Sequence, residues 1–226
     1  METFINALQL IFGADNELRQ IIGVTLQMSL TSTTISSLIG IPIGIFLGLY
    51  KFTGKSFVMR IINTLMAMPP VVAGLIVFMI LSRQGPLGSF GLLFSVTAMV
   101  IAQVLLITPI IAGLTASLVG TKAPQMLETT AGIALSRRQE LLLMINECKS
   151  QLVFFFLTGF GRAIAEVGAV HLVGGNVQFK TRVMTTAIML ETNKGNFEFA
   201  IALGVVLLII AFVVNSIGYR FQGEKK

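Results

Sequence analysis

Three observations on the sequence predict an all-α, polytopic membrane protein with five transmembrane helices. Hydrophobic residues make up 54% of the chain and charged residues only 12%, about half the charged fraction of soluble domains. The mean hydropathy is +0.88. Five apolar stretches reach the roughly 20 residues that cross the hydrocarbon of a bilayer. Because no internal repeat divides the chain, we expect residues 1–226 to form a single transmembrane domain.

The N-terminal segment, METFINALQLIFGADNEL, is too short and too lightly charged for a secretory signal. Its apolar residues Phe4, Ile5, Leu8, Ile11 and Phe12 share one helical face. This pattern predicts a short helix that lies in the membrane interface. A frayed tail is the alternative.

The first apolar stretch, residues 18–50, is longer than a span requires. Polar residues fill its beginning: Thr25, Gln27, Ser29, Thr31, Ser32, Thr33 and Thr34. We expect them to face protein or a wet path, because lipid cannot satisfy their hydrogen bonds. Its end carries Gly40, Gly44 and Gly48, one small residue every four. This spacing is typical of helices that pack closely in membranes.

The second stretch, residues 57–81, has Pro69 and Pro70 at its middle. Two adjacent prolines remove two helical hydrogen bonds, so the helix must kink or break there. Broken helices at membrane depth usually line a cavity, and a purely structural kink is the alternative. The third stretch, residues 92–119, is interrupted only by Gln103 and Pro109.

The fourth stretch, residues 152–173, contains two charges well inside a span, Arg162 and Glu166. Residues four apart share a helix face, and each charge alone would cost a few kcal/mol at the bilayer centre. We therefore expect them to pair and to face the bundle interior. They lie beside a translocation path, or they form a structural ion pair that locks two helices. The fifth stretch, residues 197–219, is the most plainly apolar.

The longest polar break lies between the third and fourth stretches, at about residues 120–150. Its run TKAPQMLETTAGIALSRRQELL predicts two short helices joined by a bend. Pro124 suits the first turn of the first helix, and Ser136 with Gln139 forms a capping-box start for the second. So polar a segment must lie in water between two spans.

The distribution of basic residues predicts the orientation of the chain. One side collects Lys51, Lys55, Arg60, Lys122, Arg137, Arg138, Lys149, Arg220, Lys225 and Lys226. The other side has Arg19, Arg83, Lys180, Arg182 and Lys194. The 120–150 loop and the C-terminus are therefore expected in the cytoplasm, and the N-terminus outside. Because these residues lie at span ends and not in one patch, the net charge of +6 does not predict nucleic-acid binding.

Residues that carry chemistry are scarce in this sequence. His171 has no second His or Cys nearby to complete a metal site, and the single Cys148 excludes an intrachain disulfide. No phosphate-binding loop or Ser/His/Asp pattern occurs. We therefore expect neither an enzyme nor a cofactor, and any ATP hydrolysis would belong to a separate subunit.

Three stretches of the sequence carry a resemblance to a known family. The polar loop after the third stretch, followed by GRAIAEVGAVHLVGGN in the fourth, resembles the permease subunit of an ATP-binding-cassette importer of the oxyanion branch. The run from Arg162 through Glu166 to Gly168 is similar to the R-x-x-x-E-x-G run of oxyanion permeases. MPPVVAGL, from Met68, resembles their second-span proline motif. Tungstate permeases resemble the chain most, and molybdate and sulfate permeases are near relatives.

In this family the cytoplasmic loop carries an EAA triplet that docks into a groove of the ATPase. Glu128, Thr129 and Thr130 occupy the triplet here, Ala134 stands where the family has Gly, and the later Leu-Pro is missing. The resemblance thus assigns two sets of site residues. The ATPase-coupling loop would comprise Glu128, Thr129, Thr130, Ala134, Ser136 and Arg137. The translocation path or gate would comprise Arg162, Glu166, Pro69 and Pro70.

The resemblance implies a type I ABC importer-like fold with a coupling-helix loop, in a multi-pass subunit of the cytoplasmic (inner) membrane. Its partners would be a second identical copy, two ATP-binding-cassette ATPase subunits, an extracytoplasmic substrate-binding protein and the lipid membrane. The substrate would be an oxyanion, tungstate first, with molybdate or sulfate as alternatives. An ion-coupled secondary carrier or a channel is the alternative of another class.

Overall fold

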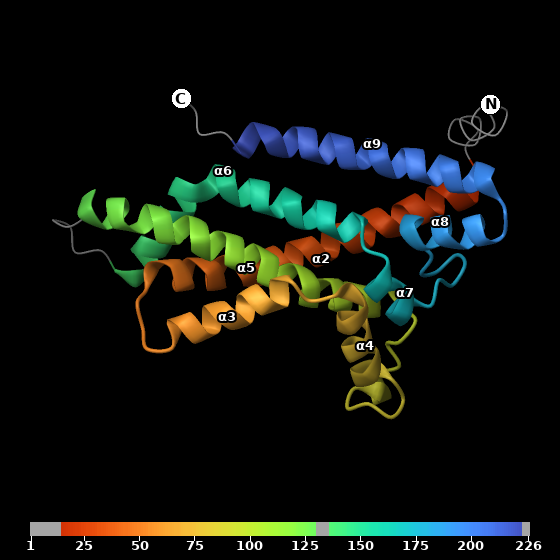
Figure 1. Cartoon of the computed structure of the whole chain (residues 1–226), viewed down its shortest axis with the longest axis horizontal. Helices are drawn as coiled ribbons and strands as arrows, with labels where there is room; N and C mark the ends of the chain where they lie inside the picture. The colour runs from red at the N-terminus through yellow and green to blue at the C-terminus, as the bar shows by residue number, and fades with distance from the viewer. Residues whose placement is uncertain (1–14, 130–135, 223–226) are drawn as a thin grey trace.

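A computed structural model describes residues 15–129 and 136–222 of the chain. The N-terminal helix expected around Phe4 to Phe12 therefore lies outside the described residues. The described part consists of helices and connecting segments, without a strand (Figure 1). The all-α expectation is confirmed.

Four long helices form the body of the molecule and lie roughly along one direction (Figure 1). They are α2 (Asn16–Leu49), α5 (Val96–Thr129), α6 (Arg137–Ile164) and α9 (Phe197–Gln222). Each is long and apolar enough to cross a membrane. Within residues 15–129 and 136–222 these make 4 candidate spans, or 5 if one bent helix pair counts as a span. Helix α2 begins at Asp15, whose side chain accepts a hydrogen bond of 2.9 Å from the Leu18 N–H.

Helices α2 and α5 pack along the glycine positions that the sequence indicated. A Cβ at Gly44 would lie 2.5 Å from the Cβ of Thr115, and one at Gly48 would lie 2.5 Å from the Cβ of Val119. Real side chains do not approach so closely. The expected packing role of this glycine spacing is confirmed, and only glycine fits at Gly44 and Gly48 without a shift of the partner helix.

The second apolar stretch breaks at its two prolines, as expected. Helix α3 (Lys55–Met66) ends before Pro69, which is extended, and Pro70 opens α4 (Pro70–Leu81) at the position where its missing N–H costs nothing. The two helices are bent by 99°. Helix α4 therefore runs across the long helices instead of continuing along them (Figure 1).

The polar segment after the third stretch differs from the expectation. Helix α5 continues to Thr129, so the first of the two short polar helices belongs to the third span, and Pro124 lies inside it and not in a first turn. Ala123 and Met126 are buried in a cluster with Met144 and Cys148 of α6. Burial of these residues stabilises the helical conformation on both sides of Pro124. Tertiary packing therefore overrides the local preference of this proline for the first turn of a helix.

The second polar helix begins as expected and then runs on into the membrane. Ser136 and Gln139 form the capping box that starts α6. The bend between the two helices, residues 130–135, lies outside the described residues.

The fourth stretch is also not one helix. Helix α6 ends at Ile164, and a short helix, α7 (Gly168–Gly174), follows after a break. A further helix, α8 (Met184–Asn193), and a single 3-10 turn, η1 (Gly88–Phe90), were not expected from the sequence. Both are too short to show a clear apolar period.

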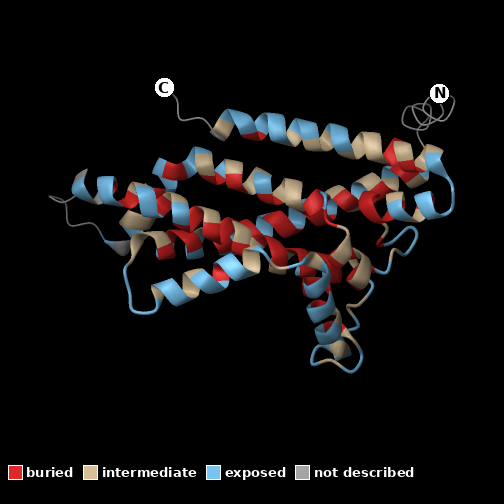
Figure 2. Cartoon of the chain, in the orientation of Figure 1, coloured by how far each residue is buried: buried red, intermediate tan, exposed pale blue. Residues whose placement is uncertain are grey.

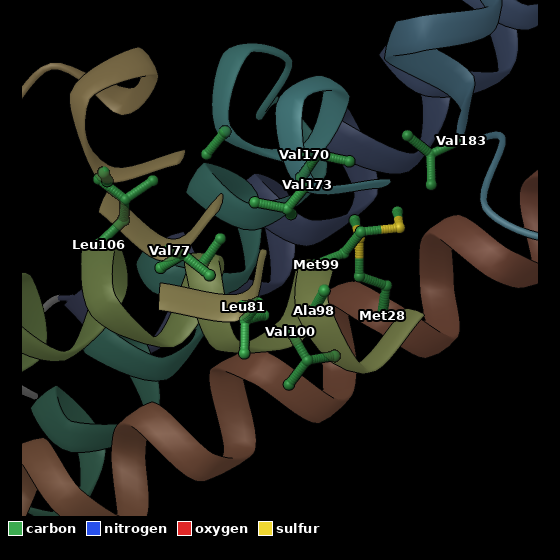
Figure 3. Close-up of a cluster of buried hydrophobic side chains, with 13 residues drawn as sticks. Met28, Val77, Leu81, Ala98, Met99, Val100, Leu106, Val170, Val173 and Val183 are labelled. Carbon is green, nitrogen blue, oxygen red and sulfur yellow. The ribbon is translucent and has the colours of Figure 1, made fainter. Parts of the chain in front are cut away.

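Buried residues concentrate where the helices cross at the centre of the molecule, and the outer faces are exposed (Figure 2). One cluster joins Met28 of α2, Val77 and Leu81 of α4, Met99 of α5 and Val173 of α7 (Figure 3). This cluster fixes α4 and α7 against the long helices.

Substitution of Gly44 by alanine should destabilise the α2–α5 pair. The added methyl group would meet Thr115 and the Ala112 carbonyl oxygen at 2.5 and 2.6 Å, and overpacking of this kind typically costs about 1–3 kcal/mol. Gly23→Ala in the same helix is the matched control, because nothing lies within 4 Å of its added Cβ. Thermal unfolding of the purified protein in detergent measures both. Equal melting temperatures for the two variants would contradict the proposed close packing.

Candidate functional site

The break between α6 and α7 holds the ion pair that the sequence predicted. The Arg162 Nη1 donates to the Glu166 Oε2 at 2.9 Å. The pair forms, but not along one helix face: Arg162 lies in the last turn of α6, and Glu166 lies in the non-helical link that follows. Glu166 is only 3% exposed, whereas 38% of the Arg162 side chain is exposed. The carboxylate is therefore enclosed in the bundle, whereas part of the Arg162 side chain is accessible.

Glu166 also shapes the backbone around the break. Its Oε1 accepts from the Ala169 N–H at 3.1 Å, which satisfies a free donor in the first turn of α7. Its own carbonyl accepts from the Thr185 hydroxyl of α8 at 2.8 Å. One residue thus joins the end of α6, the start of α7 and the start of α8.

Gln103 of α5 supports the other side of the break. Its Nε2 donates to the Ala163 carbonyl at 2.8 Å, and its Oε1 accepts from the Ser32 hydroxyl of α2 at 2.6 Å. The Ala163 carbonyl also accepts from the Glu166 N–H at 3.3 Å, so the Gln103 amide adds a second donor at the end of α6 and ties three helices together. The sequence showed Gln103 only as an irregularity in an apolar stretch. A single amide in such a stretch is itself the signal of a buried polar contact.

The polar residues at the start of the first span divide between two environments. Thr25, Ser29, Ser32 and Thr33 are buried against the rest of the bundle, as expected. The remaining three are Gln27, Thr31 and Thr34, which are exposed on the outer face of α2.

The two broken segments meet at this site. A Cβ added to Gly74 of α4 would lie 2.7 Å from the Cα of Ala169, and one added to Gly168 would lie 2.8 Å from a methyl group of Val71. The helix that begins at Pro70 therefore packs on α7, directly after Glu166. Of the predicted path residues, Arg162 and Glu166 are in contact, and Pro69 and Pro70 lie in the segment packed beside them.

The predicted coupling residues lie at the opposite end of the long helices (Figure 1). Glu128 and Thr129 end α5, Ser136 caps α6, and Arg137 is its first residue. Thr130 and Ala134 lie outside the described residues. Glu128 and Ser136 are exposed.

A side-chain contact ties this end of the molecule to the first span. The Tyr50 hydroxyl, at the end of α2, donates to the Glu140 carboxylate of α6 at 2.9 Å. The ends of α2 and α9 and the start of α3 lie at this same end (Figure 1). Most of the basic residues that the sequence placed on the inner side are in or next to these segments.

A second charged cluster, which the sequence did not indicate, lies at the other end of α2. Glu17 pairs with Arg182 at 2.9 Å and Glu191 with Lys194 at 2.8 Å, around a cavity of about 150 Å³ that Asn196 also lines. Burial would raise the pKa of the Glu191 carboxyl, but hydrogen bonds from Lys194 and Asn196 and the nearby charges together lower it. These partners come from distant segments, so no local pattern could reveal the cluster.

Among the described residues no group of His, Cys, Asp and Glu could hold a metal ion. Long apolar helices with an ion pair at a helix break are typical of a multi-pass membrane protein that has a polar functional site between its spans.

The comparison with known families agrees with this class. The family described as "Binding-protein-dependent transport system inner membrane component" matches residues 40–223. The chain therefore belongs to this family of ABC importer permeases, and the fold expected from the sequence is confirmed.

Curated relatives cover nearly the whole chain. The "Tungstate uptake system permease protein TupB" of Peptoclostridium acidaminophilum is 40% identical over 223 residues, which is 99% of this chain and 98% of the relative. The protein of the same name from Campylobacter jejuni is 39% identical over 97% of this chain and 92% of the relative. More distant is the "Sulfate transport system permease protein CysW" of Synechocystis, 24% identical over 94% of this chain and 78% of the relative. All three are transport permeases by name.

Replacement of Arg162 and Glu166, singly and together, should reveal strong coupling between them. Glu166→Gln alone leaves the cation without its counter-charge, and Arg162→Met alone leaves a buried carboxylate, whereas the double variant removes both. Contacting charges typically show a coupling energy of about 1–3 kcal/mol in a double-mutant cycle. Thermal unfolding of the four proteins in detergent measures it. Additive losses would mean that the 2.9 Å contact contributes no stability.

Proposed function

We propose that this chain is the membrane-spanning permease subunit of an ATP-driven importer, and that its substrate is an oxyanion, tungstate first. The observation that carries the proposal is the identity of about 40% with tungstate uptake permeases along almost the whole chain. Molybdate and sulfate are the alternative substrates. Sulfate permeases belong to the same family at lower identity.

Arg162 is the residue through which the chain would contact the passing anion. Its guanidinium presents several N–H donors in a fixed fork that suits an oxyanion, and one of them is bonded to Glu166. The side chain is partly exposed, so further donors can face a path. An uncompensated cation would hold the anion too tightly for release, because transport requires binding weak enough to leave. Glu166 would supply that compensation.

The polar end of the molecule would dock the ATPase. Glu128 lies at the end of α5 and Ser136 caps the start of α6, and these two helices extend from there into the bundle. A rigid helix held in a groove of the ATPase would transmit closure of the ATPase pair to the spans joined to it. The complete assembly would contain two copies of this chain, two ATPase subunits and an extracytoplasmic binding protein.

The proposed orientation of the chain in the membrane rests on the basic residues at the end of the molecule that carries Glu128 and Ser136. Basic residues collect there, and such residues favour the cytoplasmic side. The C-terminus would therefore lie in the cytoplasm and the N-terminus outside. The charged cluster around Glu17 and Arg182 would then face the binding protein.

Uptake by reconstituted vesicles tests the substrate and the energy source. With the binding protein and the ATPase present, tungstate should accumulate only when ATP is supplied on the ATPase side. Excess molybdate or sulfate in competition ranks the anions. Accumulation of tungstate without ATP would favour an ion-coupled carrier. Uptake of sulfate that tungstate does not diminish would identify sulfate as the substrate.

The same uptake assay shows whether the Arg162–Glu166 pair only stabilises the structure or also takes part in transport. The Arg162→Met, Glu166→Gln double variant should fold yet lose uptake by at least about tenfold, since a charge-assisted hydrogen bond contributes about 1.5–3 kcal/mol. Full uptake by this folded variant would reduce the pair to a structural role.

Thiol labelling tests the orientation and the docking surface together. A cysteine at Glu128 should react with an impermeant reagent in inside-out vesicles, and the bound ATPase should protect it. A cysteine at Thr53 is the control, expected to react from the same side without protection. A cysteine at Val177 should react only in right-side-out vesicles. The native Cys148 is buried and should stay unlabelled. Reaction of Glu128→Cys and Val177→Cys from one side would contradict the proposed topology.

A further inference from the structure

Helix α3 turns an apolar face away from the bundle. Its buried residue, Ile62, packs in a cluster with Leu47 of α2 and Ala116 of α5. The outer side carries Phe57 and Ile61, which are 65% and 44% exposed. Figure 2 shows most of this helix as exposed or half-buried. The outer face of α3 is therefore suited to contact with hydrocarbon.

A groove of about 330 Å³ lies on this face, and we call it the α3 groove. Its lining consists of Phe57, Arg60, Ile61, Thr64 and Leu65. The Thr64 hydroxyl donates to the Arg60 carbonyl oxygen at 2.8 Å, so its proton is not free for a ligand. The guanidinium of Arg60 is thus the charged group of a lining that is otherwise mostly apolar.

Arg60 has no counter-charge within residues 15–129 and 136–222. No carboxylate of this part of the chain forms an ion pair with it. Residues 50–69 contain two further cations, Lys51 and Lys55, and no acidic residue. Arg60 lies five residues after Lys55, about 7.5 Å further along the helix axis. A cation at such a place beside apolar surface needs either a route to water or an anion that neutralises it.

An unpaired guanidinium beside an apolar groove fits the two parts of a phospholipid. The fork of N–H groups binds a phosphate through two donors, and an acyl chain covers apolar walls that a free phosphate would leave exposed. The two lysines near the start of α3 favour a lipid with net negative charge over one whose headgroup adds a cation. We propose that the α3 groove binds one anionic phospholipid, with its phosphate on Arg60 and an acyl chain along Phe57 and Ile61.

Lipid titration of the purified chain in detergent tests the proposal. The lipids are dioleoylphosphatidylglycerol and dioleoylphosphatidylcholine, which have the same acyl chains, and native mass spectrometry measures the binding of each. The chain should bind phosphatidylglycerol several-fold more tightly than phosphatidylcholine. Arg60→Gln should weaken the binding of phosphatidylglycerol about fivefold, which is the contribution of one basic residue at an anionic membrane surface. Its binding of phosphatidylcholine should change less.

Two further variants separate the charge from the groove. Arg220→Gln is the matched control, because Arg220 is an exposed cation in the last turn of another helix, α9. It should leave the affinity for phosphatidylglycerol within about twofold of the unaltered chain. Ile61→Ser removes an apolar wall and keeps the charge, so it should weaken the binding of both lipids alike. If Arg60→Gln does not fold, this third variant decides, and unchanged lipid binding by it would refute the groove.

The other outcomes are equally decisive. Equal affinity for the two lipids, or equal losses in Arg60→Gln and Arg220→Gln, would overturn the proposal. Displacement of the lipid by glycerol phosphate would make the groove a site for a free phosphate, and displacement by tungstate would place Arg60 on the transport path. Binding of the lipid needs neither the ATPase nor the transported anion. Failure of tungstate uptake would therefore leave the lipid site standing, and loss of the lipid site would leave the proposed substrate untouched.

Discussion

The structure depends on one constraint, namely that backbone hydrogen-bonding groups within a membrane must find partners inside the protein. Long helices satisfy it without help. Where a helix breaks, a side chain must take over, and in this chain Gln103, Glu166 and Thr185 do so around the end of α6. The candidate site is therefore also a structural joint. Its ion pair cannot be separated from the geometry of the break in which Glu166 lies.

Features set by neighbouring residues could be predicted from the sequence. The prolines at 69 and 70 broke their span, the glycines of α2 marked its contact with α5, and Ser136 with Gln139 started α6. The contact between Arg162 and Glu166 was also predicted, because a spacing of four residues brings the two side chains within reach even where the helix ends between them.

Features set by distant contacts could not be predicted. Pro124 reads locally as a helix start, but burial of Ala123 and Met126 against α6 carries α5 through it. The partners of Gln103 are 60 and 71 residues away, and the charged cluster joins Glu17 to Arg182 across 165 residues. A pattern read over one or two turns contains none of these distances. The coupling residues were assigned only through the family motif, because nothing in the local sequence pattern around Glu128 and Ser136 indicates docking.

The first span is fastened at both of its ends. Tyr50 joins its C-terminal end to α6 through Glu140, and Glu17 joins its N-terminal end to the segment before α8 through Arg182. Between them α2 runs as one helix of 34 residues, with Pro42 inside it, over about 51 Å. A movement that shifts α2 relative to α6 or to the segment before α8 must therefore break one of these two contacts. The two side chains thus limit how far α2 can move independently of its neighbours.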